Sequence, residues 1–314
     1  MICIVTQHFN LNRICLMLIG LWPYECSKLV RFQTFFCFTI LISSVVYQLA
    51  VFISEDCTIN LILKVFSIAL LFFMYVIEYN SFRINRQIIK WSLDQLQHIC
   101  DELKDEKEID IMKKCGDDTR RYTILLIRKR IYIIYYRIEK AIAINMLKNS
   151  SLENEFMMYR EIIHAVDIHR KAMKSTILFF SGFQRSRFIL LIIGVLTLSL
   201  NFYEISEIIS YGRDIYDCLF HFLIIIDIFA YVFLFNYAGQ EFTDHNEHIF
   251  TTVYNVQWYV TPIHVQKLIL FLLQRGNKTV SLNFGIVFVL SMELFAALAK
   301  ASISYFTVVC SMQL

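Results

Sequence analysis

The chain has 314 residues, of which 57% are apolar, and its 30 basic and 27 acidic side chains give a formal net charge of +3. A soluble domain of this length needs much less apolar material to fill one core, because its surface residues must be polar. Two prolines and eight glycines leave few helix breakers, so the composition predicts an all-α, polytopic membrane protein.

Five stretches are long and apolar enough to cross a bilayer, whose hydrocarbon core needs about 20 residues of helix. They are residues 32–53, 59–80, 188–209, 218–240 and 279–314. Lys64 and Glu78 lie near the ends of the second stretch, where long side chains can reach the interface. Asp227 lies inside the fourth, where an acid marks either a functional site or a hydrogen-bonded structural contact. We therefore predict five membrane helices.

The basic residues predict the orientation, because Lys and Arg gather on the cytoplasmic side of membrane proteins. Segments 1–31, 81–187 and 239–281 hold 27 of the 30 basic residues, whereas the loop 54–58 has two acids and no base. The N-terminus is therefore predicted to be cytoplasmic and, with five spans, the C-terminus extracellular. The predicted organisation is a cytoplasmic segment 1–31, two spans in 32–80, a cytoplasmic helical region 81–187, two spans in 188–240, a cytoplasmic segment 241–278 and a last span in 279–314.

Segment 121–147 is apolar in parts but is not expected to cross the membrane. Arg128, Lys129 and Arg130 divide it, and each charge at the centre of a span costs about 2.5–3.5 kcal/mol. One more span would also place every later loop on the side that its charge disfavours. We predict a cytoplasmic or interfacial segment here.

Apolar residues recur at spacings of three and four in the predicted cytoplasmic region and form a stripe. Arg170 occupies the one position of this repeat that is not apolar. Its members are Phe156, Tyr159, Ile163, Val166, Met173, Ile177 and Phe180. This spacing predicts an amphipathic helix that packs against other helices. Packing within the chain and packing between subunits are equally compatible with it.

The sequence gives no support to an enzyme, a metal site or a cofactor. It lacks the HExxH and GxSxG motifs and a nucleotide-binding loop, and none of its nine cysteines has metal-ligand spacing. His164 and His169 are five residues apart and do not share a helix face. Reduced thiols are expected, and Cys57 and Cys218, near the predicted outer face, form the one pair that could be a disulfide.

The last predicted span mixes hydroxyl groups with small apolar side chains in its final turns. Ser304, Val308, Ser311 and Met312 fall on one helix face. A polar stripe with an apolar constriction suits a pore helix, since a narrow hydrophobic ring closes a channel by dewetting. A frayed helix end at the membrane interface would have the same composition, and the residues alone leave both interpretations open.

Motifs along the chain resemble those of the insect odorant receptor family. The amino-terminal one is residues 11–24, Leu-Asn-Arg-Ile-Cys-Leu-Met-Leu-Ile-Gly-Leu-Trp-Pro-Tyr, which resembles the segment before the first membrane helix of that family. The others are 136–139 (Tyr-Arg-Ile-Glu), 236–240 (Asn-Tyr-Ala-Gly-Gln), 254–259 (Tyr-Asn-Val-Gln-Trp-Tyr), 266–275 (Gln-Lys-Leu-Ile-Leu-Phe-Leu-Leu-Gln-Arg), 291–295 (Ser-Met-Glu-Leu-Phe) and 300–306 (Lys-Ala-Ser-Ile-Ser-Tyr-Phe).

The resemblance implies a seven-helix subunit of a ligand-gated, non-selective cation channel in the plasma membrane of olfactory sensory neurons. It implies a heterotetramer with the odorant receptor co-receptor and ligands that are small volatile organic molecules. It also implies that 241–278 is a cytoplasmic anchor region and that the last helix lines the pore, with Val308 and Met312 at the gate. The implied anchor and interface residues are Gln240, Tyr254, Trp258, Tyr259 and Lys267.

The chain departs from the family pattern after residues 120–123, which resemble the start of the third helix. Most of the third helix, the second extracellular loop and part of the fourth helix are missing, which predicts an internal deletion and impaired odorant binding. Any pocket that survives is expected among apolar and aromatic residues of the second and fourth stretches, for which ordinary helix packing is the alternative. These candidates are Val65, Phe66, Ala69, Tyr216, Phe220 and His221.

Other receptor and transport classes fit the sequence less well. A G-protein-coupled receptor would have an extracellular N-terminus, and the chain has only Pro23 and Pro262 and lacks DRY and NPxxY patterns. A gustatory receptor of the same superfamily would end in a TYxxxxxQF motif, which Ser304, Tyr305 and Gln313 match only loosely. A transporter would show interrupted helices in inverted repeats, which the chain lacks.

Overall fold

The computed structural model describes residues 10–54, 58–102, 152–212, 215–255, 258–276, 282–284 and 288–311. Its helices, in chain order, are α2 (Asn10–Leu18), α3 (Lys28–Ser54), α4 (Ile59–Ile84), α5 (Arg86–Glu102), α8 (Leu152–Tyr211), α9 (Ile215–Asn255), the 3-10 helix η1 (Trp258–Val260), α10 (Ile263–Gly276) and α11 (Met292–Ser311). A small antiparallel hairpin of β1 (Asn283–Phe284) and β2 (Phe288–Val289) precedes α11. The described residues are almost entirely helical, which confirms the all-α class.

Five helices among the described residues are long and apolar enough to cross a membrane, as predicted. Two of them extend well beyond their apolar stretches, because α8 is one helix of 60 residues and α9 one helix of 41. The last begins at Met292, after the hairpin, and its first turn is capped by Ser291, whose Oγ accepts a hydrogen bond from the Leu294 N–H at 3.1 Å. Segment 121–147 lies outside the described residues.

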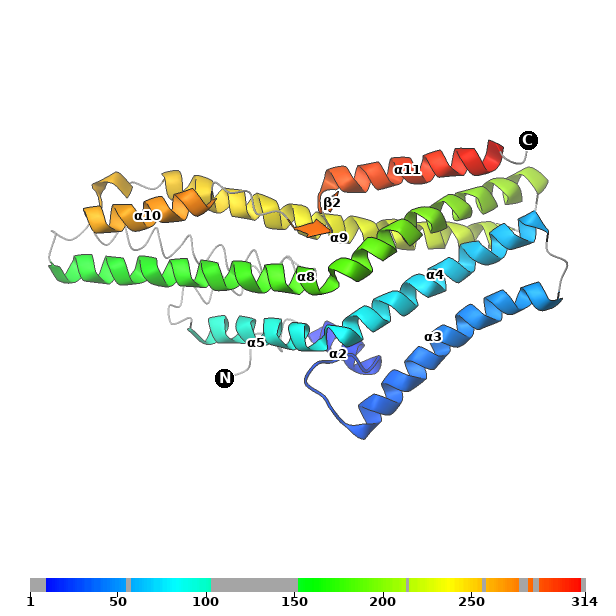
Figure 1. The fold of residues 1–314 in the computed structure, drawn as a ribbon, viewed down its shortest axis with the longest axis horizontal. Coiled ribbons are helices and arrows are strands. Elements are labelled where there is room, and N and C mark those ends of the chain that lie inside the picture. The colour runs from blue at the N-terminus through cyan, green and yellow to red at the C-terminus, as the bar shows by residue number, and fades with distance from the viewer. Residues whose placement is uncertain are drawn as a thin grey trace. The chain divides into compact units, whose positions relative to one another are not determined.

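The chain divides into two compact units, which we describe separately (Figure 1). Unit 1 consists of Met1–Leu11, Ile88–Ser181 and Ala238–Leu282, and unit 2 of Asn12–Gln87, Gly182–Tyr237 and Asn283–Leu314. The two long helices α8 and α9 each contribute a part to both units.

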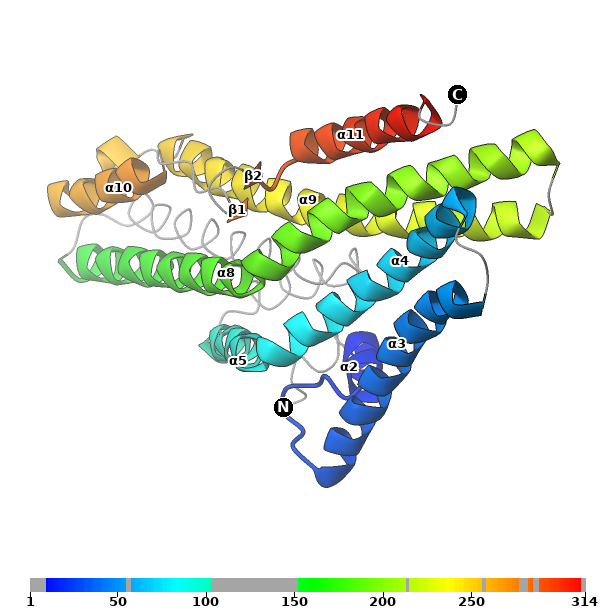
Figure 2. The same ribbon diagram turned by 45° about the vertical axis from the view of Figure 1, so that its right-hand side comes forward.

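Unit 2 contains the five apolar stretches and packs around a core shared by four helices. Leu71 of α4, Leu198 of α8 and Ile228 of α9 are buried in it, and Phe295 and its neighbours bring α11 against them. Helix α3 lies beside α4 (Figures 1 and 2), but its apolar side chains other than Val30 stay exposed or half-buried. Such exposure is stable where hydrocarbon is the solvent, which fits a membrane-facing helix.

The segment that follows α2 is fastened to α3 and to the end of α4. Gly20, with a φ of +72°, accepts a hydrogen bond on its carbonyl from Thr34 Oγ1 at 3.3 Å. Tyr79 of α4 donates through its hydroxyl to the Ile19 carbonyl at 3.0 Å, and Arg86 Nη2 donates to the carbonyl of Trp22 at 3.1 Å. These contacts give the motif at residues 11–24 a structural role, since they hold α2 against the ends of α3 and α4.

Unit 1 is built from the amino-terminal half of α8, the end of α9, η1 and α10. Its core contains Met158, Ile162 and Ala165 of α8 packed against Val265 and Ile269 of α10. The buried face of α8 is therefore next to the predicted stripe and not on it. Most of the predicted stripe stays exposed or half-buried in one chain, and only Phe180 is buried.

Candidate functional site

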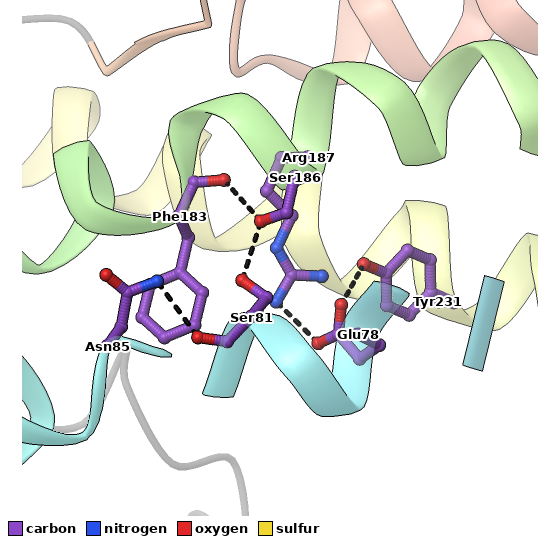
Figure 3. A network of polar contacts seen from close by, with 7 residues as sticks. All are labelled: Glu78, Ser81, Asn85, Phe183, Ser186, Arg187 and Tyr231. Carbon is purple, nitrogen blue, oxygen red and sulfur yellow. Dashed lines mark hydrogen bonds and ion pairs between the residues drawn. The ribbon is translucent and has the colours of Figure 1, made fainter. Parts of the chain in front are cut away.

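A charged side chain lies inside unit 2, where α4, α8 and α9 meet (Figure 3). Arg187 of α8 is 7% exposed, and its Nη2 donates to Glu78 Oε1 of α4 at 2.8 Å. The hydroxyl of Tyr231, on α9, donates to the second Glu78 oxygen at 3.1 Å. One half-buried acid thus receives hydrogen bonds from two other helices, and Arg187 neutralises its charge.

Aromatic rings surround the rest of the Arg187 guanidinium. Its central carbon lies 4.3 Å from the Phe235 ring centroid, 5.2 Å from that of Tyr231 and 5.8 Å from that of Phe183. Nε and Nη1 are buried without a hydrogen-bond partner among the described residues. Ring faces carry partial negative charge, so they replace part of the hydration that these two groups lose.

Hydroxyl groups join the same two helices beside the ion pair. Ser81 Oγ and Ser186 Oγ lie 2.6 Å apart, and Ser186 Oγ also donates to the Phe183 carbonyl at 2.9 Å. The Asn85 side chain donates to the Ser81 carbonyl at 3.0 Å and closes the end of α4 (Figure 3). The position of Glu78 near a span end was predictable from the sequence, but its pairing with Arg187 was not predicted. The sequence did hold one indication of this pairing, because Arg187 directly precedes the apolar stretch 188–209.

A second polar contact lies toward the other end of α4. His221 Nδ1 and Asn201 Oδ1 are 2.8 Å apart, and the Asn201 amide donates to the Thr197 carbonyl at 2.7 Å and the Ser67 carbonyl at 3.4 Å. All four residues are buried. The contact therefore ties α4, α8 and α9 together through an uncharged network.

The six candidate pocket residues do not gather on one surface. Val65, Ala69 and His221 are buried in helix packing, whereas Phe66, Tyr216 and Phe220 are exposed. The Phe66 ring turns toward Phe52 of α3, with centroids 6.2 Å apart. Within one chain, the buried three serve as packing and the exposed three face away from the core.

Asp227 is exposed and has a structural partner. Its Oδ2 accepts a hydrogen bond from the Tyr75 hydroxyl at 2.6 Å, so Asp227 and His221 have different partners on different faces of α9. Lys64 lies 3.6 Å from Asp217 in a solvent-accessible ion pair. Cys57 lies outside the described residues, and Cys218 carries a free thiol.

The predicted pore face of α11 is uncovered, while its other side packs on α8. Ser304, Val308 and Ser311 are exposed, and Met312 lies outside the described residues. Ser302 is fully buried, and its carbonyl accepts a hydrogen bond from Ser199 Oγ at 3.1 Å. Positions 302 and 304 point to nearly opposite sides of a helix. A single chain thus holds α11 by one side and leaves the predicted pore side free.

The candidate anchor residues lie in α9, η1 and α10, and most of them point outward. Tyr254, Tyr259 and Lys267 are exposed, and Trp258 is half-buried against the core of unit 1. Gln240 donates through Nε2 to Asp244 Oδ1 one turn later at 2.7 Å. Tyr254 stacks on Phe250 with ring centroids 6.4 Å apart, and the Tyr259 ring lies 6.2 Å from that of Trp258.

An open, mostly apolar cleft of about 670 Å³, with Arg170 and Lys174 among its lining residues, lies on unit 1 between α8 and α10. Ile163, Val166, Met173 and Ile177 line it from α8, and Phe271 lines it from α10. These α8 residues belong to the predicted amphipathic stripe. Ile163 and Ile177 are exposed and Val166 and Met173 are half-buried, so much of the stripe is surface.

Comparisons with known proteins identify the fold. A family model described as 7tm odorant receptor matches residues 111–303. The solved insect olfactory receptor OR5 from Machilis hrabei aligns with a TM-score of 0.67 and 12% identity over 96% of this chain and 99% of that one. The same receptor in complex with eugenol aligns with a TM-score of 0.65 and 13% identity over 98% of each chain. No curated protein matches the sequence.

Proposed function

Since the chain belongs to the 7tm odorant receptor family, we propose that it is a subunit of a ligand-gated, non-selective cation channel that responds to small volatile organic molecules. The observation that supports this proposal best is the position of α11. The helix is held on α8 through Ser199 and Ser302, while Ser304, Val308 and Ser311 are uncovered. A stripe of hydroxyls around one apolar position can carry hydrated ions when wet and close when dry.

One chain supplies one such helix, and a pore needs several around an axis. We infer a heterotetramer with the odorant receptor co-receptor, in which Val308 and Met312 form the gate. The subunits would meet through the cleft of unit 1, the exposed Tyr254 and Tyr259, and Lys267. Aromatic residues of this kind are enriched at protein interfaces, and an apolar cleft that its own chain leaves open is suited to a partner helix.

The orientation that we propose has a cytoplasmic N-terminus and an anchor region inside the cell, in the plasma membrane of olfactory sensory neurons. It rests on the basic residues, of which 27 of 30 fall in alternate connections. Acidic loops between the paired spans support the same assignment.

We further propose that this form lacks the helices that would complete an odorant pocket. The described residues contain five membrane-length helices, and three charges at 128–130 oppose a further span in 121–147. The six candidate pocket residues divide between helix packing and exposed surface. Val65, Ala69 and His221 would then be the remainder of a binding wall.

The test is co-expression of the chain with the co-receptor in cells that lack both. We expect the two chains to co-purify and a Val308→Glu variant to change the cation selectivity of the basal current, with little odorant-evoked current. Failure to co-purify, or a selectivity insensitive to residue 308, would reject the channel proposal. A normal odorant response would reject only the proposed deletion, which sequencing of the transcript across codons 120–135 tests separately.

A further inference from the structure

Two neighbouring cavities lie in unit 2 where α2, the start of α3 and the end of α4 come together. The first has a volume of about 350 Å³. Arg31 of α3, Arg83 of α4 and Arg86 of α5 line it, together with Ser27 and Thr34. Among the described residues that line this cavity there are three arginines and no acid, so it is a compact positive chamber.

The second cavity is a groove of about 510 Å³ with an almost wholly apolar lining. Leu16, Ile40 and Leu41 supply side chains from α2 and α3, and Tyr75 does so from α4. Glu78 is the one charged side chain on its wall, and that carboxylate is bound to Arg187. The groove therefore offers a surface that hydrocarbon, and not water, covers well.

Leu21 and Phe82 line both cavities, so the charged chamber and the apolar groove adjoin. The shared wall is held in place by the contacts of the segment after α2. Arg86 donates to the carbonyls of Trp22 and Glu25, and Tyr79 donates to that of Ile19. The two cavities thus form one continuous site, with a charged chamber at one end and an apolar groove at the other.

The chemistry of the lining identifies the ligand class. Guanidinium groups match phosphate oxygens in geometry and charge, and several in one chamber repel one another unless an anion lies between them. A soluble phosphate compound has no apolar part, so it would leave the adjoining apolar groove unoccupied. An amphiphile with an anionic head and an apolar chain occupies both.

We propose that this pair of cavities binds an anionic phospholipid of the cytoplasmic leaflet. Its phosphate lies between Arg31 and Arg83, and one acyl chain lies in the groove along α3 and α4. The leaflet follows from the proposed orientation, which puts this end of α3 and α4 on the cytoplasmic side, where anionic lipids are concentrated. The site is separate from the pore face of α11 and from the candidate odorant residues.

The test uses the purified full chain in detergent, mixed with equal amounts of phosphatidylserine and phosphatidylcholine that carry the same acyl chains. Retained lipid is then measured by native mass spectrometry. We expect phosphatidylserine to be retained preferentially and Arg31→Gln/Arg83→Gln to weaken its retention by about fivefold for each arginine removed. Arg185→Gln is the matched control, since Arg185 is an exposed arginine of the same unit outside the lining.

A second variant tests the groove. Leu41→Trp places bulk where the chain would lie and is expected to lower retention of phosphatidylserine with all arginines present. Equal retention of the two lipids by the unaltered chain, or an equal loss in the Arg185→Gln control, would overturn the proposal. So would displacement of the lipid by equimolar glycerophosphoserine, which has the head group alone. The measurement needs neither co-receptor nor odorant, so its failure is distinct from failure of the channel proposal.

Discussion

Arg187 and Glu78 form an ion pair of 2.8 Å between α8 and α4, inside the apolar packing of unit 2. A guanidinium or a carboxylate alone in such surroundings is costly, whereas the pair is neutral and is enclosed by Tyr231 and two further rings. The pair therefore contributes to the specific arrangement of three membrane helices more than to their affinity for one another.

Arg187→Gln is expected to lower the free energy of unfolding by about 1–3 kcal/mol, because it leaves the half-buried Glu78 carboxylate without a cation. The measurement is denaturant-induced unfolding of the purified protein. Arg185→Gln, on an exposed turn of α8, is the control and should change stability by no more than about 0.5 kcal/mol. Adding Glu78→Gln to Arg187→Gln should recover part of the loss, and a double variant less stable than the single one would argue against the pairing.

Gly20→Ala is expected to destabilise the protein more than Gly212→Ala does. Both glycines have a positive φ, +72° and +63°, so both substitutions cost about 1–2 kcal/mol of backbone strain. A Cβ on Gly20 would also lie 2.9 Å from Thr34 Oγ1, whereas one on Gly212 meets nothing within 4 Å. Thermal unfolding of the two variants side by side isolates this contact. Equal losses would mean that the segment after α2 is not packed on α3 as described.

Val308→Asn is expected to raise the basal current of the assembled channel several-fold, because an amide at an apolar constriction keeps it hydrated. The matched control is Ile303→Asn, which places the same group at an exposed position on a different face of α11. Whole-cell current in the absence of odorant, normalised to surface protein, is the readout. If both variants raise the current equally, the pore face has been assigned wrongly.

Phe271→Asp is expected to reduce co-purification with the co-receptor strongly, since it places a charge in the apolar cleft of unit 1. Leu270→Asp makes the same change at an exposed neighbouring position of α10 that does not line the cleft. Pull-down of the tagged co-receptor compares the two at equal expression. Retention of the complex by Phe271→Asp would exclude the cleft as a subunit interface.

The five membrane-length helices among the described residues could be predicted from the sequence, because insertion depends on local apolar length. Helix ends were harder to predict. The sequence placed a boundary between a cytoplasmic region and a membrane span at residue 187, but helix α8 continues through it without a break. Arg187 does not mark the end of the apolar region, because it is paired with Glu78 inside unit 2. The start of α11 at Met292 depends on a hairpin and a serine cap that hydropathy does not detect.

Contacts between helices were predicted least well, because they depend on which faces meet. The stripe through Ile163 and Ile177 looked like a packing face, but α10 packs mainly on the side chains beside it, among them Ile162. The candidate pocket positions show the same limit, with Val65 and His221 buried and Tyr216 exposed. Spacing identifies the faces of a helix but does not identify which neighbour covers each face.

Both the channel proposal and the lipid site depend on the proposed orientation of the chain, and labelling of terminal epitope tags in living cells tests it most directly. The account predicts that an amino-terminal tag is reached by antibody only after permeabilisation, while a carboxy-terminal tag is reached in intact cells. An amino-terminal tag detected on intact cells would contradict it.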